Sequence, residues 1–193
     1  MEYFAVIDTE TNWIDQVMSI GVVVAESHTF QAVDDKYYVL TPEYEIGGMY
    51  EQGLFADKRL HPVVCTREAA INDLTKWLGG YHIGDIYAYN ASFDYNHLPE
   101  FAKFQWYDII RLAAYRQFNP YIPACAECCS TGRMKRDYGV EPMLRLLSGN
   151  SSYHETHNAL YDAVDELEIM RLLGYQPDTY IPLRKSVKSC NRK

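Results

Sequence analysis

The chain has 193 residues, of which 48% are hydrophobic and 23% charged, a composition typical of one globular domain. Its formal net charge of −8 argues against a protein that coats duplex nucleic acid through a basic surface. No apolar run approaches the ~20 residues of a membrane span, and no secretory signal precedes the first predicted strand, so we expect an intracellular, cytoplasmic protein with no membrane partner. The five cysteines, an odd count, are expected to be reduced.

The first part of the chain predicts a three-stranded antiparallel meander. Its β-prone segments are bounded by polar residues, with a hairpin turn expected at 26–28. The strands are expected at 3–10, 17–25 and 28–40. Residues 42–64 follow as a long irregular segment with glycine breakers and several apolar side chains. Such a segment is either a functional loop packed over a site or a short helix that covers the sheet.

The rest of the chain alternates helices and strands, which indicates an α/β sheet of mixed strand order. Thr66 is expected to cap a helix that Gly79 and Gly80 end. Further strands are expected at 83–89 and 105–108, and further helices at 90–101, 109–118, 138–147 and 158–173. Pro99 is expected to kink or shorten its helix, Pro142 to interrupt its own, and Gly174 to end the last one.

Two carboxylates end the first predicted strand. Asp8 and Glu10 are separated by one residue, and side chains alternate along a strand, so both point to the same face. Like charges at this separation repel each other unless a countercharge is present. A divalent cation would supply it, because hard cations prefer oxygen ligands. The alternative is a solvated strand end that happens to be acidic.

Three residues further along the chain fit the same chemistry. Asp94 lies in the first turn of a predicted helix, and His157 and Asp162 lie at the start of the last helix. Five residues on a helix correspond to about 140° of net rotation, so His157 can share a site with Asp162 only if it precedes or forms the helix cap. Four carboxylates and one histidine are the groups needed for two-metal phosphoryl hydrolysis, with the histidine as general base.

Three motifs resemble those of the DEDDh, or DnaQ-like, 3′–5′ exonucleases. They are residues 6–11 (Val-Ile-Asp-Thr-Glu-Thr), 89–94 (Tyr-Asn-Ala-Ser-Phe-Asp) and 157–163 (His-Asn-Ala-Leu-Tyr-Asp-Ala), in the family's order. The resemblance implies a ribonuclease-H-like fold, with a mixed five-stranded sheet of three antiparallel and then two parallel strands. It implies two Mg²⁺ or Mn²⁺ ions and release of nucleotides from the 3′ end of single-stranded DNA or RNA. The residues implied as metal ligands are Asp8, Glu10, Asp94 and Asp162, with His157 as general base.

The same resemblance suggests which residues meet the substrate. Thr9 and Thr11 are expected to contact the terminal nucleotide, and Trp13 is placed on a loop where it could stack on a base. Asn90 and Phe93 are weaker candidates for such contact. Asn90 has the alternative role of capping the following helix, and for Phe93 packing in the core is the favoured interpretation.

A cysteine-containing insertion at about 119–137 departs from the family pattern. Cys125, Cys128 and Cys129 are compatible with a zinc site, a redox disulfide or reduced thiols, and we favour reduced thiols because a closed zinc site lacks a nearby fourth ligand. Three basic residues follow and could hold backbone phosphates, or belong to a solvated loop: Arg133, Lys135 and Arg136. We expect an exonuclease domain at 1–175 and a basic tail at 176–193.

Competing hypotheses remain open at this point. The chain could be the proofreading or repair subunit of a polymerase complex, with the basic tail as the contact to that partner. A non-catalytic nucleic-acid-binding module of the same fold is disfavoured, because all five expected catalytic positions are present. A nucleotidyl-transfer enzyme of the wider fold would not require His157. Relatives in this family are often dimers, so a homodimer is a further alternative.

Overall fold

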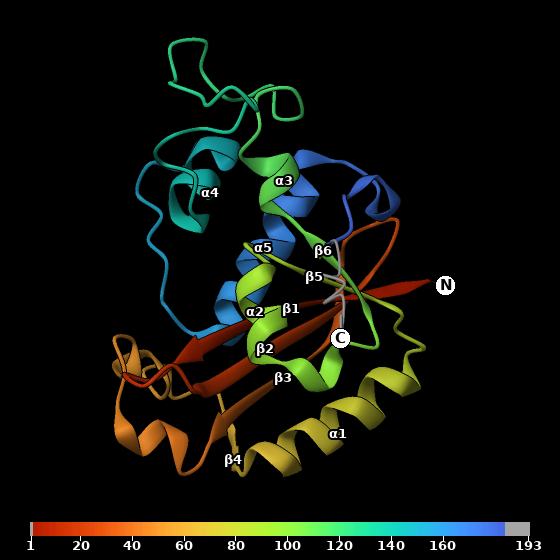
Figure 1. Cartoon of the computed structure of the whole chain (residues 1–193), viewed down its shortest axis with the longest axis vertical. Coiled ribbons are helices and arrows are strands. Elements are labelled where there is room, and N and C mark those ends of the chain that lie inside the picture. Colours follow the sequence, from red (N-terminus) through yellow and green to blue (C-terminus); the bar gives the residue numbers. More distant parts are fainter. Residues whose placement is uncertain (1, 184–193) are drawn as a thin grey trace, which may run out of the picture.

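A six-stranded mixed sheet forms the centre of the molecule, with strand order β4-β3-β2-β1-β5-β6 (Figure 1). The computed structural model describes residues 2–183. Its strands are β1 (Tyr3–Thr11), β2 (Val17–Glu26), β3 (Ala32–Leu40), β4 (Val63–Cys65), β5 (Asp85–Ala88) and β6 (Gln105–Asp108). Strands β1, β2 and β3 are antiparallel, whereas β5 pairs in parallel with both β1 and β6. This confirms the predicted class and strand directions.

The prediction of five strands missed β4, which pairs in parallel with the edge strand β3. The sequence gives little sign of this strand, because it has three residues, none fully buried, and follows an irregular segment. That segment holds two short 3-10 helices, η1 (Glu43–Ile46) and η2 (Glu51–Gly53).

The helices follow the predicted order, with some differences in length. They are α1 (Arg67–Gly80), α2 (Ser92–His97), α3 (Ile110–Ala113), α4 (Val140–Ser148) and α5 (Ala159–Leu173), with 3-10 turns η3 (Pro99–Phe101) and η4 (Pro177–Thr179). Pro99 ends α2 as expected. Pro142 does not interrupt α4, because it lies in the first turn, where its missing N–H would have no helical partner.

The helix expected over 109–118 is much shorter than predicted and ends at Ala113. The carbonyls that would continue it are used by other groups. The Asn119 amide donates to the Ala113 carbonyl at 2.7 Å, and the Met134 N–H donates to the Ala114 carbonyl at 2.9 Å. Contacts with residues of the insertion therefore override the local helical pattern.

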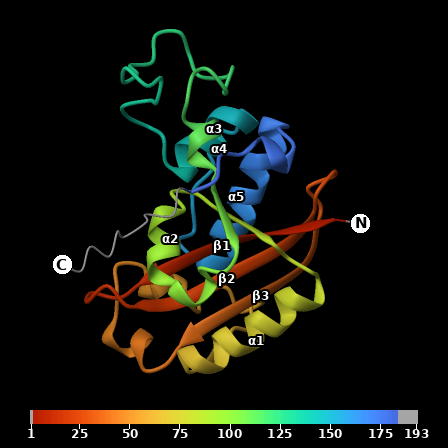
Figure 2. The ribbon, with the colours of Figure 1, turned by 45° about the vertical axis from the view of Figure 1, so that its right-hand side comes forward.

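Helices cover both faces of the sheet (Figures 1 and 2). Alternate residues of β1 point to opposite sides: Phe4 and Val6 pack in one core cluster with α5 and α4, and Ala5 and Ile7 in another with α1. Since Asp8 and Glu10 continue the even-numbered series, β1 directs them to the face covered by α5.

The start of α5 lies directly against β2 at Gly21. A Cβ atom at this glycine would be 2.1 Å from the Ala159 carbonyl carbon and 2.2 Å from the Leu160 nitrogen. Asn158 caps the helix by accepting hydrogen bonds from the Leu160 and Tyr161 N–H groups, and Gly174 ends it in the left-handed conformation, as predicted. This close approach determines where the first turn of α5 meets the sheet.

The segment after α5 packs against the domain as far as the structure describes it. Tyr180 is buried, Pro182 bridges to Tyr107, and the Leu183 N–H donates to the Trp106 carbonyl at 2.8 Å. The tail expected from residue 176 is therefore packed up to Leu183, and its basic part, 184–193, lies outside the described residues. No helix in residues 2–183 is long and apolar enough to cross a membrane.

We expect Gly21→Ala to destabilise the protein by about 3 kcal/mol or more, because the added methyl group would collide with backbone that cannot move alone. Gly79→Ala is the matched control, since a Cβ there meets no atom within 4 Å, and it should stabilise α1 by up to about 1 kcal/mol. Urea unfolding followed by circular dichroism measures both. Equal stability of the Gly21 variant and the parent would contradict the close packing.

Candidate active site

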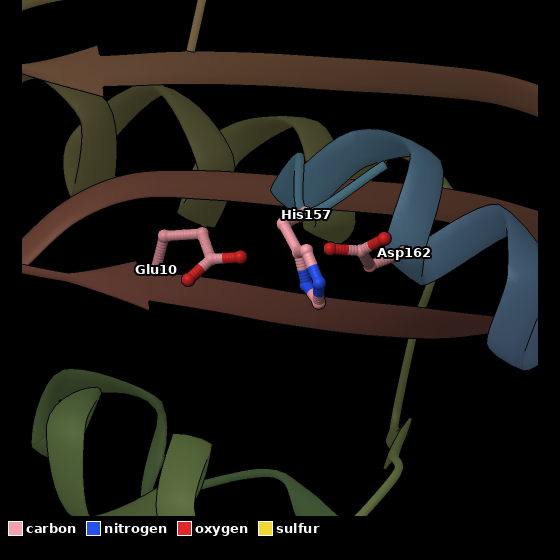
Figure 3. Close-up of side chains that lie close together, drawn as sticks. All are labelled: Glu10, His157 and Asp162. Atoms are coloured by element: carbon pink, nitrogen blue, oxygen red, sulfur yellow. The ribbon is translucent and has the colours of Figure 1, made fainter. Parts of the chain in front are cut away.

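Glu10, His157 and Asp162 meet at the end of β1 (Figure 3). Each offers one potential ligand atom, and these atoms all lie within 4.8 Å of one another. His157 immediately precedes the cap residue Asn158, and Asp162 lies in the first turn of α5. The condition set by helix geometry, with the histidine outside the helix and the aspartate inside it, is confirmed.

Asp94 joins the cluster from the other side of β1. It is 2% exposed, in the first turn of α2, and the Thr9 hydroxyl donates to its Oδ1 at 2.8 Å. Burial raises the pKa of Asp94 well above its usual range, and the charge of Asp8 is the next largest cause. Asp8 and Asp94 are therefore electrostatic neighbours, and the structure brings all five predicted catalytic residues together.

The cluster carries more negative charge than its surroundings compensate. The pKa is raised to about 7 for Asp8, about 8 for Glu10 and about 10 for Asp162. Burial is the largest cause in each case, followed by the charge of Glu155 for Asp8 and by that of Asp8 for the other two. The buried Oδ1 of Asp162 has no hydrogen-bond partner among the described residues. Buried, unpaired carboxylate oxygens of this kind fit a hard divalent cation.

Two further carboxylates belong to this environment and were missed from the sequence. Glu166 is 1% exposed, and its Oε2 has no hydrogen-bond partner among residues 2–183. Burial and then the charge of Asp8 raise its pKa well above the usual range. The available signal was spacing, because Glu166 lies one helical turn after Asp162 on the same face. Glu155 had no comparable signal, since it lies in the irregular segment before α5.

The long segment 42–64 combines the two expected forms, because it contains the short helices η1 and η2 and also packs against His157 through Tyr50. The Tyr50 ring stacks on the His157 ring with a centroid distance of 4.0 Å and an interplanar angle of 18°. The Asn158 amide donates to the Gly53 carbonyl at 3.0 Å and to the Tyr37 hydroxyl at 2.9 Å. The helix cap thus connects the loop, β3 and α5 beside the histidine.

A cavity of about 430 Å³ opens next to Glu10 and contains most of the residues predicted to contact substrate. Its walls include Thr9, Thr11, Trp13, Tyr50 and Phe93. The favoured interpretation of Phe93 as a core residue is wrong, because Phe93 is 37% exposed and lines this cavity with Trp13, which is 65% exposed. The hydroxyl of Thr9 is already used to hold Asp94.

His97 connects two walls of this cavity. Its Nε2 is 3.1 Å from Asp15 Oδ1, and its ring lies against Phe93 with a centroid distance of 4.3 Å. Asp15 belongs to the loop after β1 and Phe93 to α2, so His97 holds two walls of the cavity together.

Asn90 lies elsewhere, in the wall of a second cavity. The alternative role as a helix cap is not observed, because Ala91 is the cap residue of α2 and no side chain caps it. Asn90 adopts a left-handed conformation with φ 62°, which asparagine tolerates better than most residues.

No disulfide joins the cysteines of the insertion, Cys125, Cys128 and Cys129, to one another. Cys65, Cys125, Cys128 and Cys129 form no disulfide with described residues. Over residues 2–183, the one group of three or more potential ligands close enough to share an ion is Glu10, His157 and Asp162. Cys190, a distant candidate ligand, lies outside the described residues.

No family model and no curated protein matches the sequence. Solved structures do match. The nuclease domain of 3′hExo, a DEDDh family member bound to rAMP, aligns over 95% of this chain and 97% of that one, with 14% identity and a TM-score of 0.66. Exonuclease X in complex with 5′ overhanging duplex DNA aligns over 91% and 95%, with 18% identity and a TM-score of 0.53. E. coli Exonuclease I in complex with a dA16 oligonucleotide aligns over 93% and 42%, with 11% identity and a TM-score of 0.58.

The chain has the fold of the DEDDh 3′-exonucleases. At these identities the likeness concerns the ribonuclease-H-like backbone.

The raised carboxyl pKa values predict an unusual pH dependence of stability. A carboxyl group whose pKa is higher in the folded than in the unfolded chain binds its proton more tightly when folded, so stability falls as pH rises from the unfolded value near 4. Because the pKa is raised to about 7 for Asp8 and to about 8 for Glu10, the melting temperature in EDTA should fall by about 5 °C between pH 5 and pH 8. Mn²⁺ at pH 8 should restore it.

Thermal unfolding with and without Mn²⁺ measures this effect. Asp8→Asn should flatten the pH dependence and weaken the response to Mn²⁺, because one of the interacting charges is removed. Asp35→Asn, on the exposed end of β3, is the control and should behave like the parent. A melting temperature in EDTA that rises between pH 5 and pH 8 would show that the carboxylates do not repel one another in the folded state.

Proposed function

We propose that the chain is a metal-dependent 3′–5′ exonuclease that hydrolyses nucleotides from single-stranded 3′ ends. The observation that carries the proposal is the convergence of Asp8, Glu10, Asp94 and Asp162 with His157 at one end of the sheet. A binding module would gain nothing from burying four like charges, whose repulsion costs stability. A phosphoryl hydrolase requires them.

The donor set suits two Mg²⁺ or Mn²⁺ ions, which would polarise the scissile phosphodiester and lower the pKa of the attacking water. Glu10 and Asp162 lie close enough to share an ion, and the charge of Asp8 acts on both Asp94 of α2 and Asp162 of α5. Thr9 holds Asp94 in place through its hydroxyl.

His157 is the proposed general base that takes the proton from the attacking water. Imidazole is suited to this role because its ordinary pKa lies close to neutral pH. Its position before the helix cap leaves the ring free of the α5 backbone, and stacking against Tyr50 limits the directions in which it can turn.

The cavity beside Glu10 is the proposed site of the terminal nucleotide. Trp13 and Phe93 present exposed aromatic side chains there, and stacking of a base on an aromatic ring contributes about 1–3 kcal/mol. Stacking requires an unpaired base, which favours single-stranded ends over intact duplex. The structural neighbours include complexes with an oligonucleotide and with rAMP, so both DNA and RNA 3′ ends belong in the test.

We expect Asp8→Asn to abolish release of mononucleotides from a 5′-labelled single-stranded oligonucleotide in Mg²⁺ or Mn²⁺. His157→Ala should reduce kcat by about 10²–10⁴-fold, the usual range for loss of a general base. Gel analysis of matched DNA and RNA oligonucleotides, labelled at either end and with EDTA as a control, gives the polarity and the sugar preference.

Two exposed residues serve as matched controls, Asp35→Asn and His61→Ala, and both should keep parental activity. Products that shorten from the 5′ end, or full activity of the Asp8 variant, would remove the assignment. Unchanged kcat in the His157 variant at neutral pH would remove only the general-base role.

Tyr50 is expected to act by positioning His157. Tyr50→Leu should lower kcat about tenfold, because a base that is misplaced by an ångström or less loses much of its effect. Tyr50→Phe keeps the ring and should retain most of the activity. Stabilisation by Mn²⁺ should be unaltered in both variants. A loss in Tyr50→Phe as large as in Tyr50→Leu would contradict a role based on stacking.

A further inference from the structure

We propose that a second cavity, between the start of α2 and the cysteine-containing insertion, binds a backbone phosphate of the nucleic-acid strand upstream of the scissile bond. This subsite rests on the proposed exonuclease function and specifies how the strand is held. The cavity has a volume of about 190 Å³, and the polar and charged side chains in its walls are Asn90, Ser92, Asp108, Arg111, Tyr115 and Arg133. Its volume is about six times the ~30 Å³ share of one water molecule, enough for a phosphate group.

Two arginines in this cavity lack the partners that other arginines of the chain have. Arg111 and Arg133 form no ion pair and no side-chain hydrogen bond with any residue of 2–183. Arg111 is attracted electrostatically by the carboxylate of Asp108 without forming an ion pair with it. By contrast, Arg67 and Arg145 bond to carboxylates at 2.9 and 2.7 Å. Arg111 and Arg133 line the same cavity without a carboxylate ion pair. A guanidinium group matches the bidentate geometry of a phosphate.

The insertion holds Arg133 in position. The chain folds back so that Arg133 forms a β-bridge with Tyr115, and the Met134 N–H donates to the Ala114 carbonyl at 2.9 Å. The Arg133 guanidinium lies 5.0 Å from the centre of the Tyr138 ring. Tyr89, just after β5, donates its hydroxyl to the Tyr138 carbonyl. Arg133 is thus connected through Tyr138 to the strand that leads into Asn90.

The single carboxylate in the wall does not cancel the two positive charges. Oδ1 of Asp108 accepts N–H groups from Asn90 at 3.1 Å, from Ala91 at 3.4 Å and from Ile110 at 3.3 Å. These bonds direct the carboxylate at the backbone and tie the ends of β5 and β6 together. Asn90 and Ser92 add uncharged hydrogen-bond donors to the same wall.

The two cavities flank the first turn of α2. Phe93 lines the cavity beside Glu10, whereas Asn90 and Ser92 line the arginine cavity, and Asp94 follows on the same turn. A strand with its terminal base against Trp13 would pass the carboxylates and continue toward Arg111 and Arg133. In a chain with net charge −8, two neighbouring arginines without an ion-pair partner among residues 2–183 are where a polyanion would be held.

The test compares substrates with and without upstream phosphates. Arg111→Gln, Arg133→Gln and the double variant are assayed on single-stranded oligonucleotides of increasing length and on the p-nitrophenyl ester of thymidine 5′-monophosphate. We expect KM for long oligonucleotides to rise about tenfold per substitution, with the loss smallest on the ester. The slope of log affinity against log salt should fall by about 0.7 for each lost phosphate contact.

Arg171→Gln is the control, because Arg171 is paired with Glu168 on α5 at 2.6 Å and lines neither cavity, and it should leave KM near the parental value. Arg133→Lys keeps the charge and should recover part of the affinity. Equal losses on the ester and on long oligonucleotides would overturn the subsite, as would an unchanged salt slope.

Fluorescence anisotropy of a labelled oligonucleotide in EDTA separates this proposal from the exonuclease function. If the parent binds the oligonucleotide and the double variant binds it about as well, the subsite is wrong whatever the activity. If binding falls in the double variant but no hydrolysis occurs in the parent, the function is wrong and the phosphate site stands. Inorganic phosphate could also compete with the oligonucleotide in the parent while the variants bind the oligonucleotide as tightly as the parent does. That result would assign the cavity to a free anion and overturn the strand subsite.

Discussion

Repulsion among buried carboxylates is the constraint on which the rest of this structure depends. Asp8, Glu10, Asp94 and Asp162 share one region, and Glu166 adds a fifth acidic group beneath it. In water such groups would separate, so the scaffold has to hold them in place against their mutual repulsion. It does so by placing two of them on the central strand β1, which is paired with β2 at both carboxylates and with β5 at Ala5 and Val6. A central strand has little freedom to relax.

The other ligands depend on how α5 meets the sheet. Gly21 allows the backbone at Ala159 to approach β2 far more closely than any side chain would permit. Asn158 then uses both ends of its amide, accepting from the helix and donating to β3 and the long loop. His157 precedes this cap and Asp162 follows it, so one buried asparagine sets the position of a base and of an acid. The rigid placement of His157 and Asp162 therefore originates in backbone packing outside the cluster, where α5 meets β2.

The sequence was most informative where local signals and chain order agree. Strand periodicity predicted the meander, and helical spacing predicted α5. The spacing of His157 and Asp162 required the histidine to precede or form the helix cap, and the structure places it just before the cap residue Asn158. It failed where distant contacts decide the outcome. The helix after β6 ends early because residues of the insertion donate hydrogen bonds to the carbonyls of Ala113 and Ala114. No sequence pattern near Ala113 predicts these contacts. Phe93 looked like a core residue because burial is the usual fate of phenylalanine, and its exposure follows from the position of α2 over the cavity.

The charge of the molecule and the charge of its proposed substrate have the same sign, and the structure suggests how both are accommodated. The acidic cluster needs cations, which would also attract a phosphodiester. Beyond the reach of those ions, the strand needs positive charge from the protein. Arg133 supplies it from an insertion that departs from the family motifs, and Tyr138 connects that insertion to Tyr89 at the end of β5. Because the insertion contacts the end of β5, changes in the insertion can alter how the nucleic-acid strand is held without altering the carboxylates. Substrate preference and catalytic chemistry would then be carried by separate parts of the chain, joined at the start of α2.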